Sequence, residues 1–180
     1  MERTDHRLDT FVMVKTAKYE STMKRYIFLM ITAVMLTCHV QAETKYVTGT
    51  VLIDGSEVEA EYCTLDDGSV ALGNGRNACI QQYNGGFLTI PGTVTVDGTT
   101  YCVTEVSNLA FRLCDNLTGV AIEENITRVG EFAFVGCSKI KEITLPSTLQ
   151  TIGSGAFISC ADSLQSVTCL ATTPPVWEYN

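Results

Sequence analysis

The chain has 180 residues, enough for one ordinary domain, and 46% of them are hydrophobic and 18% charged, which excludes disorder of the whole chain. Its formal net charge is −8 at pH 7. This acidic balance excludes nucleic acid as a partner, because a phosphate backbone repels an acidic protein.

The N-terminal segment has the layout of a secretory signal peptide. The basic pair Lys24-Arg25 precedes an uncharged apolar run of twelve residues, 26–37, and Val40-Gln41-Ala42 then fits the small-residue cleavage pattern. We therefore predict a signal peptide at residues 23–42 with cleavage between Ala42 and Glu43. A helix of this length is too short to cross a bilayer, so we expect no permanent membrane span.

Two further interpretations concern the same segment. Residues 1–22 are polar, and Met23 stands directly before the basic pair Lys24-Arg25. We therefore expect translation to start at Met23 and residues 1–22 to be an upstream extension. Lipidation at Cys38 is an alternative to cleavage after Ala42. It is disfavoured because Met35 and Thr37 stand where a lipobox usually has Leu and a small residue.

Removal of residues 1–42 leaves 12 − 6 = 6 basic and 20 − 4 = 16 acidic residues, a net charge of −10. Both histidines, His6 and His39, lie in the removed segment. The remainder therefore lacks Ser-His-Asp and Cys-His arrangements, and without a Cys-x-x-Cys pair it offers no zinc pattern. We expect no catalytic residue, no metal and no cofactor. Seven cysteines remain, an odd number, and the sequence leaves open the pairing of Cys63, Cys79, Cys102 and Cys169.

Residues 43–102 are predicted to form a β-rich N-terminal cap. Residues 46–53 read as a strand, and Asp54-Gly55 and Gly85-Gly86 are typical of turns. Asp97-Gly98 lies between alternating residues, which predicts a hairpin. Such a cap would shield the open end of the repeats that follow.

Residues 103–173 contain three copies of a 23-residue repeat. An Ala-Phe-x-x-Cys motif recurs with Phe111, Phe134 and Phe157 and, three residues later, Cys114, Cys137 and Cys160. The period lies in the leucine-rich-repeat range of about 20–29 residues. The apolar pattern of residues 117–122 recurs at 140–145 and, after a one-residue insertion, at 164–169, which predicts one short strand per repeat.

The repeats predict a β-rich leucine-rich-repeat solenoid with the N-terminal β cap. One repeat cannot bury its own apolar residues, so stacked phenylalanines and cysteines should form a continuous core. We expect the three repeat cysteines to be reduced, because stacked side chains run parallel instead of facing each other. Gly130 and Gly153 are expected to make tight turns. The motif itself suits a compact helical or irregular corner.

The segment Ile152-Gly153-Ser154-Gly155-Ala156-Phe157-Ile158-Ser159-Cys160, preceded by Leu145-Pro146, resembles the BspA-like leucine-rich-repeat family of bacterial surface proteins. The resemblance covers about residues 100–170. It implies a secreted or cell-surface protein that adheres to matrix proteins, glycans or other cells. The chain departs from the family pattern at Ser107, at Glu123-Glu124 and in the short tail, residues 174–180, which suggests truncation.

Outward-facing residues of successive strands line up into a surface in such a stack. The candidate partner face for a protein or glycan ligand consists of Lys141, Glu142, Thr144, Gln165, Ser166 and Thr168. A second face would use Thr127, Arg128, Gln150 and Thr151. The acidic pairs Asp66-Asp67 and Glu123-Glu124 are interpreted as solvated loops. A binding module is thus the first hypothesis, a truncated remnant of a longer repeat protein the second, and a carbohydrate-active enzyme the last.

Overall fold

The computed structural model describes residues 45–80 and 85–179. The expected start at Met23, the signal peptide, its cleavage site at Ala42 and Glu43, and Cys38 lie outside this range. No helix in the described part is long and apolar enough to span a membrane. Its regular elements are the strands β1 (Tyr46–Ile53), β2 (Ser56–Thr64), β3 (Val70–Leu72), β4 (Gly86–Ile90), β5 (Thr93–Val96), β6 (Thr99–Val106), β7 (Leu117–Ile122), β8 (Arg128–Val129), β9 (Glu142–Leu145), β10 (Thr151–Ile152), β11 (Ser166–Cys169) and β12 (Val176–Trp177).

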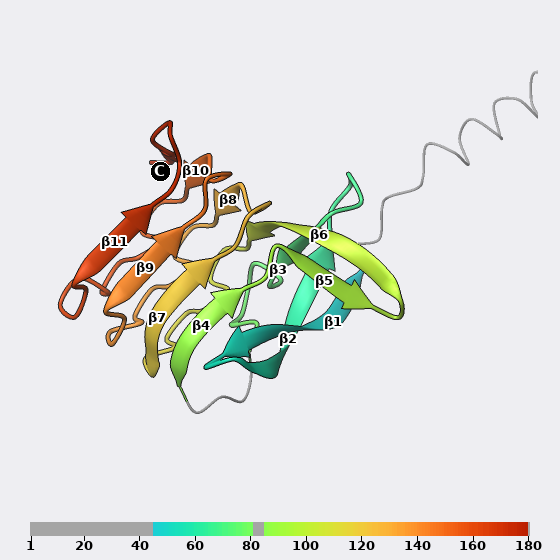
Figure 1. Ribbon diagram of the computed structural model, residues 1–180, viewed down its shortest axis with the longest axis horizontal. Helices are drawn as coiled ribbons and strands as arrows, with labels where there is room; N and C mark the ends of the chain where they lie inside the picture. The colour runs from blue at the N-terminus through green and yellow to red at the C-terminus, as the bar shows by residue number, and fades with distance from the viewer. Residues whose placement is uncertain (1–44, 81–84, 180) are drawn as a thin grey trace, which may run out of the picture. The chain divides into compact units, whose positions relative to one another are not determined.

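The strands form two parallel ladders, as expected of a β-rich leucine-rich-repeat solenoid. The first ladder consists of β4, β7, β9 and β11, which lie side by side in Figure 1. The second ladder consists of β3, β6, β8, β10 and β12. Each coil of the chain supplies one strand to each ladder. Neighbouring strands of a parallel ladder need a long connection between them, and the rest of each coil provides that connection.

The N-terminal hairpin joins the two ladders at one end. β1 and β2 pair antiparallel along their length, from Tyr46 opposite Cys63 to Ile53 opposite Ser56. β1 also pairs with β4, and β2 with β3. The hairpin thereby occupies the strand edges that the first coil would otherwise expose, which is how a repeat array closes its end.

A further coil precedes the three repeats that the sequence predicts. Leu72 of β3 lies opposite Val106 of β6, and Leu88 of β4 lies opposite Val120 of β7. Residues 70–80 and 85–90 therefore extend both ladders, although they carry no Ala-Phe-x-x-Cys motif. The predicted cap thus combines a hairpin with one degenerate coil.

Two tight turns follow the pattern that the sequence predicts. Asp54-Gly55 and Asp97-Gly98 have positive φ values of 50°, 75°, 50° and 77°, respectively. Two successive residues of positive φ make a turn whose twist matches that of the paired strands. The first turn joins β1 to β2, and the second joins β5 to β6.

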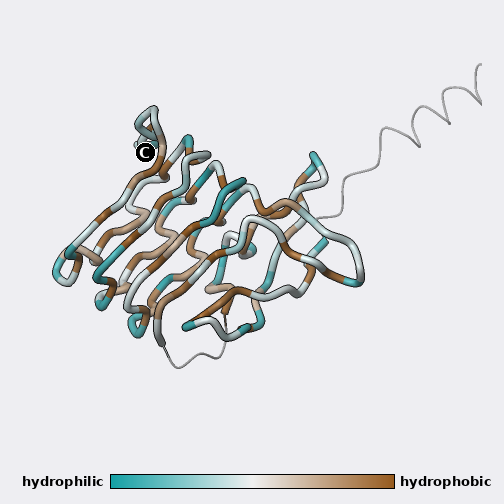
Figure 2. The backbone as a smooth tube through the Cα atoms, viewed as in Figure 1, coloured by the Kyte–Doolittle hydropathy of each residue, from teal (hydrophilic) through white to brown (hydrophobic). Residues whose placement is uncertain are grey.

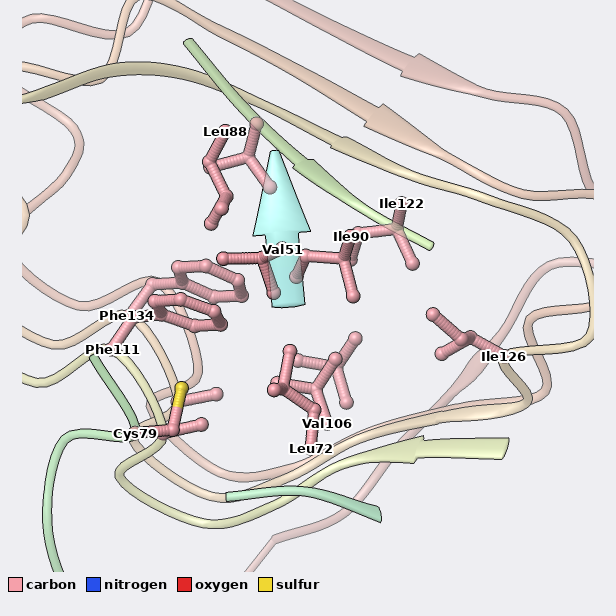
Figure 3. Close-up of a cluster of buried hydrophobic side chains, with 14 of the residues drawn as sticks. Val51, Leu72, Cys79, Leu88, Ile90, Val106, Phe111, Ile122, Ile126 and Phe134 are labelled. Atoms are coloured by element: carbon pink, nitrogen blue, oxygen red, sulfur yellow. The ribbon is translucent and has the colours of Figure 1, made fainter. Parts of the chain in front are cut away.

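The core lies between the two ladders. Figure 3 shows Val51 of β1 between Leu88 and Ile90 of the first ladder and Leu72 and Val106 of the second, and all five side chains are fully buried. Apolar residues lie along the strands, while hydrophilic residues gather at the connecting loops (Figure 2). Burial of apolar surface against the neighbouring coil is thus what holds successive coils together.

The repeat phenylalanines stack along the core. The ring centroids of Phe111 and Phe134 are 5.1 Å apart, those of Phe134 and Phe157 are 5.2 Å apart, and both ring pairs are within 5° of parallel. Phe111 and Phe134 are fully buried, whereas Phe157, in the last repeat, is partly buried. The centroid distances are typical of aromatic pairs that add to the burial energy.

The repeat cysteines form a row beside the rings. The Cys137 thiol donates a hydrogen bond to the Phe111 carbonyl at 3.0 Å, and the Cys160 thiol donates one to the Phe134 carbonyl at 3.3 Å. Burial raises the pKa of both thiols. Cys79 of the degenerate coil extends the row next to Cys114. No disulfide joins the seven described cysteines.

The repeat glycines have a different role from the predicted tight turn. Neither Gly130 nor Gly153 has a positive φ. A Cβ would instead lie 2.5 Å from the Asn108 nitrogen at Gly130 and 2.5 Å from the Glu131 nitrogen at Gly153. Glycine is therefore required by the close approach of the preceding coil.

The Ala-Phe-x-x-Cys corner is an irregular turn with two left-handed positions. The first position precedes the alanine and is occupied by Leu109, Phe132 and Gly155, with φ values of 60°, 51° and 63°. The second position precedes the cysteine and is occupied by Leu113, Gly136 and Ser159, with φ values of 60°, 78° and 64°. Each of these positions holds glycine in one copy out of three. The positive φ explains why the corner does not continue as a helix.

Candidate ligand-binding face

The first ladder brings the predicted partner residues together. Glu142 of β9 lies opposite Ser166 of β11, and Thr144 lies opposite Thr168. Glu142, Ser166 and Thr168 are exposed, and Thr144 is partly buried. The residues that precede the two strands, Lys141 and Gln165, are exposed as well. The six residues thus form one surface, which we call the ladder face.

The backbone holds the ladder face in a fixed register. The Lys141 carbonyl accepts hydrogen bonds from the Gln165 nitrogen at 2.7 Å and the Ser166 nitrogen at 3.1 Å. The Lys141 nitrogen in turn donates to the Thr118 carbonyl at 2.8 Å. Neighbouring strands in such a ladder lie about 4.8 Å apart. The outward side chains are therefore presented at a regular spacing on a rigid support.

Phe87 and Gly119 extend the ladder face toward the N-terminal end. Phe87 of β4 pairs with Gly119 of β7, and Gly119 pairs with Glu142. A Cβ at Gly119 would lie 2.6 Å from the Phe87 ring and 3.0 Å from Cγ of Glu142. The ring therefore covers the bare glycine, an arrangement that protects a glycine in a sheet. Sequence reasoning missed both residues, although Leu88-x-Ile90 matches the apolar pattern of Val120-x-Ile122 and could have placed β4 in the ladder.

The second predicted face is engaged in internal contacts. Arg128 forms ion pairs with Glu105 and with Glu178, the latter at 3.1 Å. Burial lowers the pKa of Arg128, but the two carboxylates outweigh it and leave the pKa raised. The Thr127 hydroxyl donates to the Thr104 carbonyl at 3.2 Å, and the Gln150 carbonyl accepts a hydrogen bond from the Val176 nitrogen at 2.8 Å. These contacts join neighbouring coils. They leave fewer polar groups of the second face available for hydrogen bonds to a ligand.

The two acidic pairs accept hydrogen bonds from residues of the loops. The Glu124 carboxylate accepts hydrogen bonds from the Ser147 nitrogen at 3.1 Å and hydroxyl at 2.8 Å, which lower its pKa. The Glu123 carboxylate accepts one from the Gly92 nitrogen at 3.2 Å. Asp67 accepts two from Ser69, which likewise lower its pKa. Glu123 and Glu124 thus link neighbouring coils at the place where the family pattern has proline.

Metal binding finds no support in the described part of the chain. No group of three His, Cys, Asp or Glu side chains gathers there closely enough to hold a metal ion.

Lys139, near the ladder face, forms a contact within the protein. Its ammonium group donates a hydrogen bond to the Asn116 side chain at 2.9 Å and so links two coils. What the face offers chemically is a row of charged, hydroxyl and amide groups on a rigid sheet.

The repeated coils and their motif agree with a known family. Residues 100–174 match the family model of the BspA type leucine rich repeat region (6 copies). These residues are a BspA-type leucine-rich-repeat region. The degenerate coil that contains β3 and β4 lies outside the matched range, and these two strands continue the same ladders.

Solved structures of bacterial leucine-rich repeat proteins are similar to part of this chain. A leucine-rich repeat protein from Bacteroides ovatus is 25% identical with a TM-score of 0.50, over 67% of this chain and 28% of that one. A Treponema pallidum leucine rich repeat protein is 27% identical with a TM-score of 0.49, over 60% and 46%. A leucine rich cell surface protein from Faecalibacterium prausnitzii is 25% identical with a TM-score of 0.48, over 66% and 29%.

The match to each of these three proteins covers less than half of that protein's length. No curated protein matches the sequence. The part shared with the Bacteroides ovatus protein is the repeat fold. The similarity does not extend to the activity of that longer protein.

Proposed function

We propose that the chain is a secreted or cell-surface binding module whose ladder face takes up a protein ligand in adhesion. The observation that carries the proposal is the register of β9 and β11, which sets Glu142 beside Ser166 and Thr144 beside Thr168 on an outward surface. The BspA-type repeat region supports a binding role for the protein as a whole.

The rigidity of the ladder favours binding over a purely structural role for these positions. A surface held by backbone hydrogen bonds loses little conformational freedom when a ligand docks. Lys141 and Glu142 supply opposite charges, and Thr144, Ser166 and Thr168 supply hydroxyl groups. A polar ligand surface with its own charges and hydrogen-bonding groups complements this set, as the rim of a protein interface does.

The proposed secretion of the protein rests on the sequence of the predicted signal peptide, residues 23–42. The basic pair, the apolar run and the cleavage pattern at Val40-Gln41-Ala42 match the layout of a secretory signal peptide, which supports export. Export would place the ladder face where it can meet matrix proteins, glycans or other cells. Residues 45–179 would then carry the adhesive surface.

A binding screen tests the proposal. The purified chain is applied to arrays of extracellular-matrix proteins and of glycans, and each hit is measured again by biolayer interferometry. We expect saturable binding to at least one matrix protein. A response to glycans alone would replace the protein ligand by a glycan, and no response on either array would contradict the adhesive role.

A further inference from the structure

An aromatic ring and two carboxylates meet at the N-terminal end of the ladder face. The strands β1, β4, β7 and β9 are successive neighbours in the sheet (Figure 1). The Phe87 nitrogen donates a hydrogen bond to the Asp54 carboxylate at 2.8 Å, and the Asp54 nitrogen donates one to the Phe87 carbonyl at 2.9 Å. Phe87 pairs with Gly119 on its other side, and Gly119 pairs with Glu142. Phe87 therefore stands between Asp54, on the side of β1, and Glu142, on the side of β9.

The bare glycine brings the Phe87 ring close to the Glu142 side chain. The position that a Cβ would occupy at Gly119 is 2.6 Å from Cδ2 of Phe87 and 3.0 Å from Cγ of Glu142. These two atoms are therefore at most 5.6 Å apart, the sum of the two distances. A larger residue at position 119 would place a side chain between the ring and the carboxylate. We call Asp54, Phe87 and Glu142 the aromatic–acidic site.

The groups of the aromatic–acidic site are accessible and lack charged partners within the protein. Asp54 and Glu142 are exposed, and Phe87 is partly buried, so its ring keeps some contact with solvent. Neither carboxylate forms an ion pair within residues 45–80 and 85–179. The whole chain has a net charge of −8, which attracts positively charged partners. The site thus adds an aromatic surface to a locally and globally negative potential.

This combination fits a cation better than any other group. An aromatic ring attracts a cation that lies within about 6 Å of its centroid, and a neighbouring carboxylate adds a charge-assisted hydrogen bond. A guanidinium can use both at once, because it is planar, stacks on a ring and presents a fork of N–H groups to a carboxylate. An apolar group would cover the carboxylates without pairing them, which is costly, and an anion would be repelled.

We propose that the aromatic–acidic site binds an arginine side chain of the protein ligand. The inference rests on the proposed function, because it names the group that the N-terminal end of the ladder face recognises. The guanidinium stacks on the Phe87 ring and donates hydrogen bonds to the Glu142 carboxylate, and Asp54 adds attraction from the other side of the ring. The ligand therefore presents an arginine on a basic part of its surface, complementary to the acidic chain.

NMR titration of the isotope-labelled full chain tests the site without the natural ligand. The probes are three acetylated tripeptide amides, Gly-Arg-Gly, Gly-Lys-Gly and Gly-citrulline-Gly. The arginine peptide should shift the amide signals of Phe87, Gly119 and Glu142 in a saturable manner. The lysine peptide should bind more weakly, because an ammonium cannot stack as a plane. Citrulline keeps the shape of arginine without its charge, so its peptide should leave these signals in place.

Variants assign the binding to the ring and the carboxylate. Phe87→Leu and Glu142→Gln should each raise the dissociation constant of the arginine peptide about two- to fivefold, the effect of one exposed cation–π contact or ion pair. Phe87→Trp keeps an aromatic surface and should bind the peptide at least as tightly as the unaltered chain. Asp97→Asn makes the same change in charge as Glu142→Gln in the exposed turn between β5 and β6, and it should leave the dissociation constant unchanged.

The outcomes separate this proposal from the adhesive role. Equal shifts with the arginine and citrulline peptides would overturn it, and so would equal affinity for the arginine and lysine peptides. An arginine affinity that Phe87→Leu and Glu142→Gln leave unchanged would overturn it as well, even where the matrix-protein array yields a ligand. Arginine binding that follows the expected order of variants, in a chain that binds no matrix protein and no glycan, would contradict the adhesive role alone.

Discussion

Leu109 and Leu113 illustrate a cost that individual residues bear in this fold. Both occupy left-handed positions of the repeat corner, at which other copies hold Gly155 and Gly136. A residue with a Cβ is disfavoured there by about 1–2 kcal/mol. The period of the sequence showed that these positions are equivalent. It did not reveal their backbone conformation, because bulky residues such as leucine and phenylalanine are rarely found at positive φ.

Ser159→Gly is therefore predicted to stabilise the protein. Ser159 is exposed and has a φ of 64°, so glycine relieves the strain without removing a buried contact. After the loss from the greater freedom of glycine in the unfolded chain, the free energy of unfolding should rise by up to about 1 kcal/mol. Ser154→Gly, in the same corner but outside the left-handed region, should lower it by about 0.5–1 kcal/mol. Urea denaturation of both variants measures the difference, and a gain for Ser154→Gly alone would contradict the account.

Gly153→Ala is predicted to destabilise the protein. A Cβ at this position would lie 2.5 Å from the Glu131 nitrogen and 2.6 Å from the Gly130 carbonyl carbon, and both are backbone atoms. Relief of the overlap requires the coils to separate, which should lower the free energy of unfolding by about 2–3 kcal/mol. Thermal unfolding compares this variant with Ser154→Ala, a neighbouring change expected to stay within about 0.5 kcal/mol. Equal stability of the two variants would show that the coils do not approach as closely as described.

At the scale of elements, the row of thiols makes stability depend on pH. Burial raises the pKa of Cys137 and Cys160 in the folded state. The unfolded chain therefore releases these protons first, at about pH 8.5. Their contribution to stability is complete below that pH and decreases as the pH rises toward the folded-state value. Each such thiol should lower the free energy of unfolding by about 1.4 kcal/mol per pH unit in this window.

Cys137→Ala tests this dependence. The variant loses one buried thiol, so its free energy of unfolding, measured with reductant between pH 7.5 and 9.5, should fall less steeply than that of the unaltered chain. Ile140→Val reduces the volume of a buried side chain in the same repeat and keeps the thiol, so it should lower stability at every pH and preserve the slope. An unchanged slope in Cys137→Ala would mean that this thiol ionises equally in both states.

The sequence predicted some elements better than others. The strand at residues 46–53 and the Asp97-Gly98 hairpin follow from alternation and turn chemistry, which act locally. The degenerate coil does not follow from the period. Leu72 and its partner Val106 are 34 residues apart (106 − 72) and not 23, because the hairpin β5–β6 is inserted between them. The parallel pairing of β3 and β4 with the repeats follows from the strand register in the structure and not from the sequence.

At the scale of the whole molecule, the first and the last described coil differ in how they are covered. The hairpin β1–β2 covers the first coil through strand pairing on both ladders, whereas the last coil leaves Val167 and Trp177 exposed. The repeat predicted the stack and the alignment of Glu142 with Ser166. It did not predict Phe87 over Gly119, because that contact depends on the degenerate coil. The candidate face was accordingly predicted where the repeats are regular and missed where they are not.

Paired charge reversal at two exposed glutamates tests the central claim, that the ladder face is the binding surface. Glu142→Lys alters the ladder face, and Glu57→Lys makes the same change in charge on β2 of the N-terminal hairpin. With a matrix-protein ligand obtained from the screen, Glu142→Lys should raise the dissociation constant at least about tenfold, whereas Glu57→Lys should stay within about threefold. Equal effects of the two variants, or a larger effect of Glu57→Lys, would contradict the account and move the binding surface away from β9 and β11.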